Sequence, residues 1–209
     1  MLNVQTKMLV KNLIEQLDMD KCLKNSFKNY HTEGLYYINL YRDLELTIKL
    51  YFLMPGLVKN RNVGYLVSPH THAYNFTTEV LHGSIRHITL TEAGPKDLNL
   101  QWYKYNYQSA KKPEDRLSLV GETNLCIESD INYTQGQAYY VDTNTIHSLI
   151  APEDQMTILL LHQYEDKVSE TDFYTTLSDK PSFKNIYREY TEDEINELLN
   201  LIKPLVSEV

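Results

Sequence analysis

The sequence predicts a mainly β protein, a sandwich or small barrel, with α-helices at its N- and C-terminal ends. Short runs of apolar and β-branched residues recur between positions 34 and 165 of the 209-residue chain. Turn signals such as Pro55-Gly56, Gly83 and Gly136 separate these runs. Helical periodicity is confined to the two ends, so helices do not alternate with strands as they do in parallel-sheet folds.

Both ends of the chain carry helix signals. Within residues 4–28, an apolar residue recurs at every fourth position from Leu9 to Leu17, which predicts an amphipathic helix. Near the other end, Thr191 and Glu194 have the spacing of a capping box in front of a second apolar stripe. Pro204 is expected to mark the end of that second helix.

The runs between the helices are expected to be strands, and the polar stretch KNRNVG at 59–64 is expected to be a loop. We therefore divide the chain into an N-terminal helical segment (1–33), a β-barrel (34–165), and a wrapping segment with the C-terminal helix (166–209). The expected strands lie at 35–41, 44–54, 64–72, 76–83, 84–90, 100–107, 117–123, 137–142, 147–151 and 156–164.

Composition argues against several classes of main partner. A hydrophobic content of 42% predicts a packed core, and a formal net charge of -8 disfavours nucleic acid or an anionic membrane as the main partner. Cys22 and Cys126 are the only cysteines and are expected to be reduced thiols of a cytoplasmic protein. No signal-peptide pattern and no membrane-spanning run is expected. Both a monomer and a homodimer are compatible with the sequence.

Two histidines, His70 and His72, are the first candidates for a metal site. If GYLVSPHTH is a strand, their side chains share one face, and their ring nitrogens can meet one ion at ~2.0–2.1 Å. His147, which follows a turn at 142–144, is the best candidate for a third ligand. For such a pair taken alone, a structural or exposed role remains the alternative.

The two histidine segments together resemble the motifs of the cupin family. A glycine, five residues and the histidine pair, followed later by a second glycine, span Gly64 to Gly83. The second motif spans Gly136 to His147, with Asp142 and Asn144 in the places of proline and glycine. The resemblance covers about residues 34–165. It implies a cupin double-stranded β-helix, or jelly roll, with a metal in its mouth.

One departure from the cupin pattern concerns the carboxylate of the first motif. Phe76 stands where the family has glutamate. Glu79 is nearby, but it has the opposite strand parity and so points away from the metal on a regular strand. A bulge would be needed to make Glu79 a fourth ligand. The simplest site is therefore three histidines without a carboxylate.

Three-histidine cupins include the cysteine dioxygenase-type thiol dioxygenases, which the sequence resembles further. The resemblance implies that Arg42 grips a substrate carboxylate and that Tyr164, supported by His162, lies over the metal. Phe76 is expected to contact substrate, and it rules out the thiol–tyrosine crosslink of some family members. For Arg42, a surface pair with Asp43 is the alternative. For His162, the alternative is a core histidine.

The resemblance implies an Fe(II)-dependent dioxygenase that uses O2 to oxidise a small thiol or amino-acid-like molecule. Imidazole ligands suit several transition metals, so it is the resemblance that favours iron. Two alternatives remain: a cupin iron oxygenase acting on a non-thiol biosynthetic intermediate, and a cupin that binds a small ligand without catalysis. Arg86 and His87 are expected to be surface or structural residues.

Overall fold

The computed structural model describes residues 1–30, 34–56, 66–92, 102–108, 117–176 and 188–207. The expected loop at 59–64 lies outside these residues. The elements are α1 (Val4–Glu15), α2 (Met19–Asn25), β1 (Leu35–Arg42), β2 (Leu46–Leu53), β3 (Tyr74–His82), β4 (Ser84–Thr91), β5 (Trp102–Gln108), β6 (Leu117–Thr123), β7 (Cys126–Thr134), β8 (Ala138–Val141), β9 (Ile146–Ile150), β10 (Thr157–Asp166), β11 (Glu170–Thr175) and α3 (Glu192–Val206).

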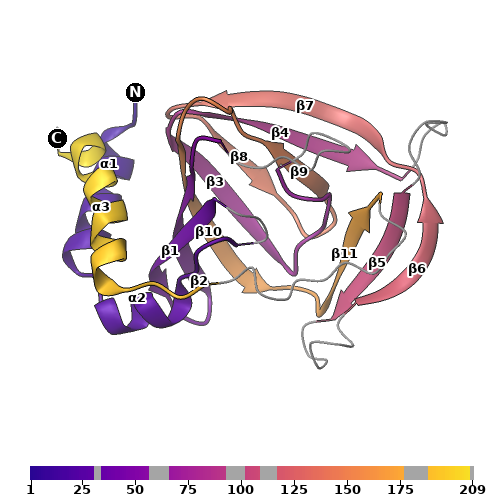
Figure 1. Ribbon diagram of the computed structural model, residues 1–209, viewed down its shortest axis with the longest axis horizontal. Coiled ribbons are helices and arrows are strands. Elements are labelled where there is room, and N and C mark those ends of the chain that lie inside the picture. The colour runs from indigo at the N-terminus through magenta and orange to yellow at the C-terminus, as the bar shows by residue number, and fades with distance from the viewer. Residues whose placement is uncertain (31–33, 57–65, 93–101, 109–116, 177–187, 208–209) are drawn as a thin grey trace.

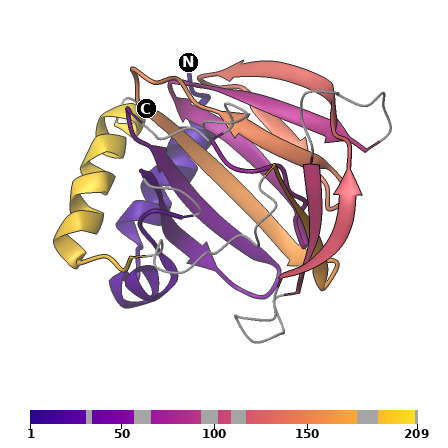
Figure 2. The ribbon, with the colours of Figure 1, turned by 45° about the vertical axis from the view of Figure 1, so that its right-hand side comes forward.

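The strands form three antiparallel sheets, in the orders β1-β2-β10-β3-β8, β7-β4-β9 and β11-β5-β6. β10 lies between β2 and β3, which come from the first half of the chain, and this interleaving is the jelly-roll arrangement. The three helices cover the outer face of the five-stranded sheet, and the other two sheets lie on its far side (Figures 1 and 2). The expected class, mainly β with helices at both ends, is confirmed.

The N-terminal helical stretch is two helices instead of one. The Asn3 side chain caps α1 by accepting from the Thr6 amide at 2.8 Å, and Asp18 caps α2 by accepting from the Lys21 amide at 3.1 Å. The second cap starts a new helix, which breaks the stretch expected to be continuous. Among the described helices, the longest has 15 residues, and none has the length and apolar character needed to cross a membrane.

The C-terminal helix α3 begins at the expected capping box. The Thr191 hydroxyl accepts from the Glu194 amide, and the Glu194 carboxylate accepts in return from the Thr191 amide at 2.9 Å. Pro204 lies inside the helix, which continues to Val206. The expected stop is corrected because a proline in the last turn removes a single helical hydrogen bond.

Alternation along the strands of the five-stranded sheet creates two distinct cores. Ile158 and Leu160 of β10 pack with the helices, whereas Leu159 and Leu161 face the interior of the barrel. Residues that pair directly across an antiparallel sheet share a face, so this assignment extends to the neighbouring strands β2 and β3. It decides which side chains can reach the barrel interior.

Two strands were not expected from the sequence. β7 is exposed along most of its length, so it lacks the apolar alternation that marks a strand, and β11 lies in the wrapping segment. β11 pairs with β5 and thereby ties the wrapping segment to the β5–β6 hairpin. The run at 64–72, expected to be a strand, is irregular in its described part.

Candidate metal centre

His70 and His72 lie on the irregular segment that precedes β3, and His147 lies on β9. The backbones of His70 and His147 exchange two hydrogen bonds, with N–O distances of 3.1 and 3.0 Å. This bridge places the histidine pair beside β9, at the edge of the sheet β7-β4-β9. The backbone bridge to His147 therefore positions the histidine pair. The regular strand expected at 64–72 is not formed in its described part.

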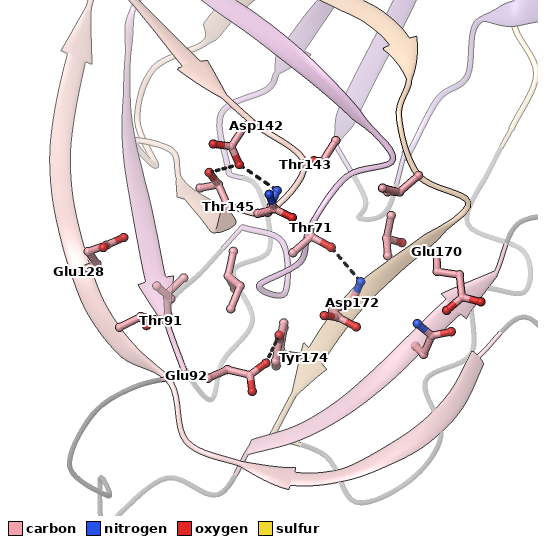
Figure 3. A pocket seen from close by; sticks show the side chains of 16 residues that line it. Thr71, Thr91, Glu92, Glu128, Asp142, Thr143, Thr145, Glu170, Asp172 and Tyr174 are labelled. Atoms are coloured by element: carbon pink, nitrogen blue, oxygen red, sulfur yellow. Dashed lines mark hydrogen bonds between the residues drawn. The ribbon is translucent and has the colours of Figure 1, made fainter.

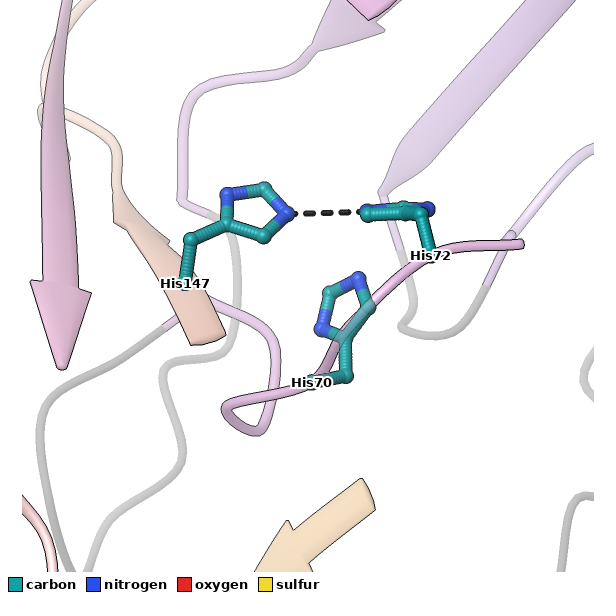
Figure 4. A group of neighbouring side chains, drawn as sticks. All are labelled: His70, His72 and His147. Carbon is teal, nitrogen blue, oxygen red and sulfur yellow. Dashed lines mark hydrogen bonds between the residues drawn. The ribbon is translucent and has the colours of Figure 1, made fainter. Parts of the chain in front are cut away.

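The three rings converge on one point (Figure 4). The Nε2 atoms of His72 and His147 are 2.8 Å apart, and ligand atoms of all three histidines lie within 4.8 Å of one another. Two nitrogens bound to one ion at ~2.0–2.1 Å, at an angle of about 90°, would be about 3 Å apart. The separation of His72 and His147 therefore fits two adjacent ligands of a single transition metal.

Hydrogen bonds fix which nitrogen of His70 faces the centre. Its Nδ1 lies 2.8 Å from the Ser68 carbonyl oxygen, which can only accept, so Nδ1 carries the proton. The lone pair of His70 is therefore on Nε2. Carbonyl oxygens that orient a histidine in this way are typical supports of metal ligands.

His147 has an equivalent support from another histidine. Its Nδ1 lies 3.0 Å from Nε2 of His87, a residue on β4 that is 4% exposed and stacks on the Tyr139 ring. Burial lowers the pKa of His87 to about 4, so this imidazole is neutral at pH 7. His87 was expected to be a surface or structural residue. The pairing of β4 with β9, which the sequence does not reveal, brings it to His147.

Burial favours the neutral form of two of the three clustered histidines, His70 and His147. It lowers the pKa of His70, and it lowers the pKa of His147 well below the usual value, with the neighbouring histidines adding to the effect. A neutral imidazole has the lone pair that a metal requires, whereas an imidazolium has none. The donor set therefore fits a divalent transition metal.

Phe76 lies at the centre, and Glu79 does not. The Phe76 ring is 4.8 Å from the His72 ring and 5.6 Å from the His147 ring. Glu79 has the opposite orientation, because its carboxylate accepts a hydrogen bond of 2.8 Å from the Thr6 hydroxyl of α1. The parity argument against Glu79 as a ligand is confirmed. In the described part of the chain, the cluster contains histidines and no carboxylate.

Tyr164 and His162 lie on the opposite face of β10 from the barrel interior. His162 pairs with Ile48, whose side chain belongs to the core beneath the helices, and Tyr164 is 40% exposed. The Tyr164 hydroxyl lies 3.3 Å from that of Thr77, which shares this outer face. The expectation that they lie over the metal is corrected by the strand register. The inward residue of this part of β10 is Gln163.

Arg42 lies at the exposed end of β1. Its guanidinium donates to the side-chain oxygen of Asn25 in α2 at 3.4 Å. The structure therefore brings together His70, His72, His147 and Phe76 from the expected site. It leaves Arg42, His162 and Tyr164 away from the cluster.

A separate cleft of about 690 Å³ lies beside the histidine segment, with Thr71 among its lining residues (Figure 3). Thr71, between the two histidines, lines this cleft, whereas none of the three histidines does. The cleft is rich in carboxylates, two of which, Glu92 and Asp172, form ion pairs with Lys104 at 2.7 and 2.9 Å. We assign the chemistry to the histidine cluster, because the cleft contains no comparable donor set.

No protein-family model matches the sequence, and no curated protein matches it. Three solved structures have a similar fold at low sequence identity. An RmlC-like cupin from Shewanella frigidimarina is 12% identical, with 69% of this chain and 87% of that chain covered and a TM-score of 0.40. Hydroquinone 1,2-dioxygenase PnpCD is 11% identical, with coverages of 71% and 72% and a TM-score of 0.38. Hydroxypropylphosphonic acid epoxidase from S. wedmorenis is 15% identical, with coverages of 66% and 53% and a TM-score of 0.37. These low values carry no information about the chemistry of this chain.

Proposed function

We propose that this protein is a non-heme Fe(II) oxygenase that uses O2 to oxidise a small organic molecule. The observation that carries the proposal is the convergence of His70, His72 and His147 without a carboxylate. The lone pair of one ligand is directed by a carbonyl, and a buried imidazole supports a second. Such outer supports are characteristic of metal ligands.

Each protein group has a defined task in this proposal. His70, His72 and His147 would hold the metal through neutral nitrogens, so the protein contributes no negative charge to it. An uncompensated +2 charge favours an anionic substrate and stabilises a thiolate over a thiol. Bound iron would supply the redox chemistry with O2.

Phe76 and the buried setting would keep water away from the reacting groups. The Phe76 side chain is 2% exposed and packs against two of the ligand rings. Exclusion of water strengthens the electrostatic interactions inside the site and suppresses side reactions. Arg42, His162 and Tyr164 have no part in this mechanism.

The first experiment measures metal content. The purified protein and its His147→Ala variant are reconstituted anaerobically with Fe(II) and analysed for bound metal. Wild type should hold about one equivalent, and H147A should lose most of it. His162→Ala is the matched control, since this histidine is on the outer face of β10, and it should retain metal. Equal metal content in wild type and H147A would overturn the metal site.

The second experiment concerns the substrate class. Oxygen consumption by the iron-loaded protein is measured with small thiols, with and without a carboxylate, and with amino acids that lack sulfur. Uptake with thiols would identify a thiol dioxygenase, the reaction that the sequence resemblance implies. Uptake only with the sulfur-free compounds would identify the other oxygenase class. No uptake by protein that holds its iron would overturn the oxygenase proposal and leave a metal-binding protein.

A further inference from the structure

Lys49 is a buried cation in the wall of the barrel. On β2 it pairs with Asn39 of β1 and with Leu161 of β10, and Leu161 belongs to the interior core. Lys49 therefore faces the interior that the histidines also face. The residue is 8% exposed, which is rare for a lysine without an ionised partner.

The polar contacts of the Lys49 ammonium are few. It donates to the side-chain oxygen of Gln163 at 2.8 Å and lies over the rings of Tyr37 and Tyr74, 5.1 and 6.0 Å from their centres. Within the described ranges, it forms no ion pair with a carboxylate. Burial is the main cause that lowers the pKa of Lys49 to about 8, so the amine is mostly protonated at pH 7. The Asp166 carboxylate partly raises this pKa without forming an ion pair with the ammonium, and the Arg42 guanidinium lowers it further. The ammonium therefore lacks a carboxylate in direct contact.

Asn39 supplies a second donor next to Lys49. Its side chain is 4% exposed, and its Nδ2 is buried without a hydrogen-bond partner in the part of the chain that the structure describes. Buried amide donors are nearly always paired, and leaving one unpaired costs about 1–3 kcal/mol. Because Asn39 and Lys49 pair directly across β1 and β2, both donors face the interior from adjacent strands.

Two routes connect these donors with the histidines. The Tyr74 ring, over which the Lys49 ammonium lies, is 5.1 Å from the His72 ring. Gln163, which accepts from Lys49, pairs with Phe76, whose ring is 4.8 Å from His72. A small molecule that reaches from the histidines along this wall would therefore meet the ammonium.

We propose that Lys49 and Asn39 form a subsite that binds the carboxylate of the substrate. The ammonium and the amide offer one donor to each of the two carboxylate oxygens, and the carboxylate supplies the anion in direct contact that Lys49 lacks in the described part of the chain. The subsite rests on the proposed function only in that the bound molecule is the substrate of the metal centre. It assigns the anchoring cation to Lys49 in place of Arg42, which lies at the exposed end of β1.

The test compares two molecules of nearly the same shape, one anionic with two acceptor oxygens and one neutral with an NH2 donor in place of one oxygen. The full-length protein, both as isolated and after metal removal, is titrated with propionate and with propionamide, and binding is followed by NMR. Wild type should bind propionate at least about tenfold more tightly than propionamide, because hydrogen bonds to charged groups contribute ~1.5–3 kcal/mol. Since metal removal leaves the subsite in place, failure of the metal site would not abolish this preference.

Three variants test which residues cause the preference for propionate over propionamide. Lys49→Met should abolish it, and Asn39→Asp should abolish it as well, because the new carboxylate would occupy the subsite with almost no change in shape. Arg42→Met should keep it. Metal content should stay at the wild-type level in all three, so loss of the subsite and loss of the metal centre are distinguished.

Several results would overturn the subsite. One is equal affinity of wild type for propionate and propionamide. Another is a preference that survives in folded K49M or in folded N39D. A preference lost in R42M and kept in K49M would transfer the anchoring role to Arg42. Far-UV circular dichroism establishes that each variant is folded, and N39D keeps the test decisive if K49M does not fold.

Discussion

Replacing Lys49 by methionine is expected to make the protein more stable at pH 7. The ordinary pKa of lysine is 10.5, and burial, reinforced by Arg42 and partly opposed by Asp166, lowers the pKa of Lys49 to about 8. At 1.36 kcal/mol per pKa unit, protonated Lys49 destabilises the folded state by about 3 kcal/mol. Methionine has a similar length and carries no charge to bury.

Part of this gain is offset by interactions that the methionine cannot make. The Gln163 oxygen loses its hydrogen bond, which costs about 1 kcal/mol, and the contacts of the ammonium with two tyrosine rings are lost as well. The net stabilisation by K49M is therefore about 1–2 kcal/mol, which corresponds to about 2–8 °C in Tm for a chain of this size.

The lowered pKa of Lys49 also predicts how the stability difference between wild type and K49M changes with pH. Below pH about 8, Lys49 is protonated in both the folded and the unfolded protein, so the full penalty is present. Between about 8 and 10.5, the folded protein has released this proton while the unfolded protein still holds it. Stability of the wild type therefore rises relative to K49M across this window, and the advantage of K49M disappears above it.

Urea unfolding of wild type and K49M at pH 7 and near pH 10 measures the effect as the difference between the two proteins. Lys167→Met is the matched control. Its ammonium is exposed and pairs with Glu165, so its loss should change stability by less than about 0.5 kcal/mol. A K49M variant that is less stable than wild type at pH 7, or a gain that does not change with pH, would refute the reasoning that the buried ammonium lacks compensation.

Three further predictions follow from individual contacts. His87→Ala should lower metal affinity about 10–100-fold in a metal titration, because it removes the support of His147; unchanged affinity would remove His87 from the site. Tyr164→Phe should leave metal content and any O2 uptake unchanged, because the hydroxyl lies on the outer face of β10; a selective loss of uptake would contradict this placement. Thr191→Ala should destabilise the fold by about 1 kcal/mol in urea unfolding without a loss of metal, because it removes the cap of α3.

Local sequence patterns predicted most of the fold and the clustering of three histidines. The alternation of β-branched and apolar residues predicted most of the strands, and the capping-box spacing predicted the start of α3. Strand alternation predicted a shared face for His70 and His72, and the resemblance to the cupin motifs implied that His147 meets them. Parity correctly placed Phe76 inward and Glu79 outward, since both lie on the regular strand β3.

Residues whose roles depend on long-range register could not be placed in the same way. Because side chains alternate along a strand, the sequence correctly placed His162 and Tyr164 on one face of β10. Only the pairing of β10 with β2 shows that this face is the one covered by the helices. His87 reaches His147 through the pairing of β4 with β9. Lys49 resembles an ordinary polar residue of an alternating strand until its neighbours on β1 and β10 are known.

The most direct test of the account is a crystal structure of the anaerobically iron-loaded protein, with the anomalous signal of iron used to locate the metal. We expect one iron bound by His70, His72 and His147, at about 2.0–2.2 Å from their nitrogens, with Phe76 beside it and no carboxylate ligand. Iron held instead by the carboxylates of the separate cleft, or ligated by Glu79, would contradict it.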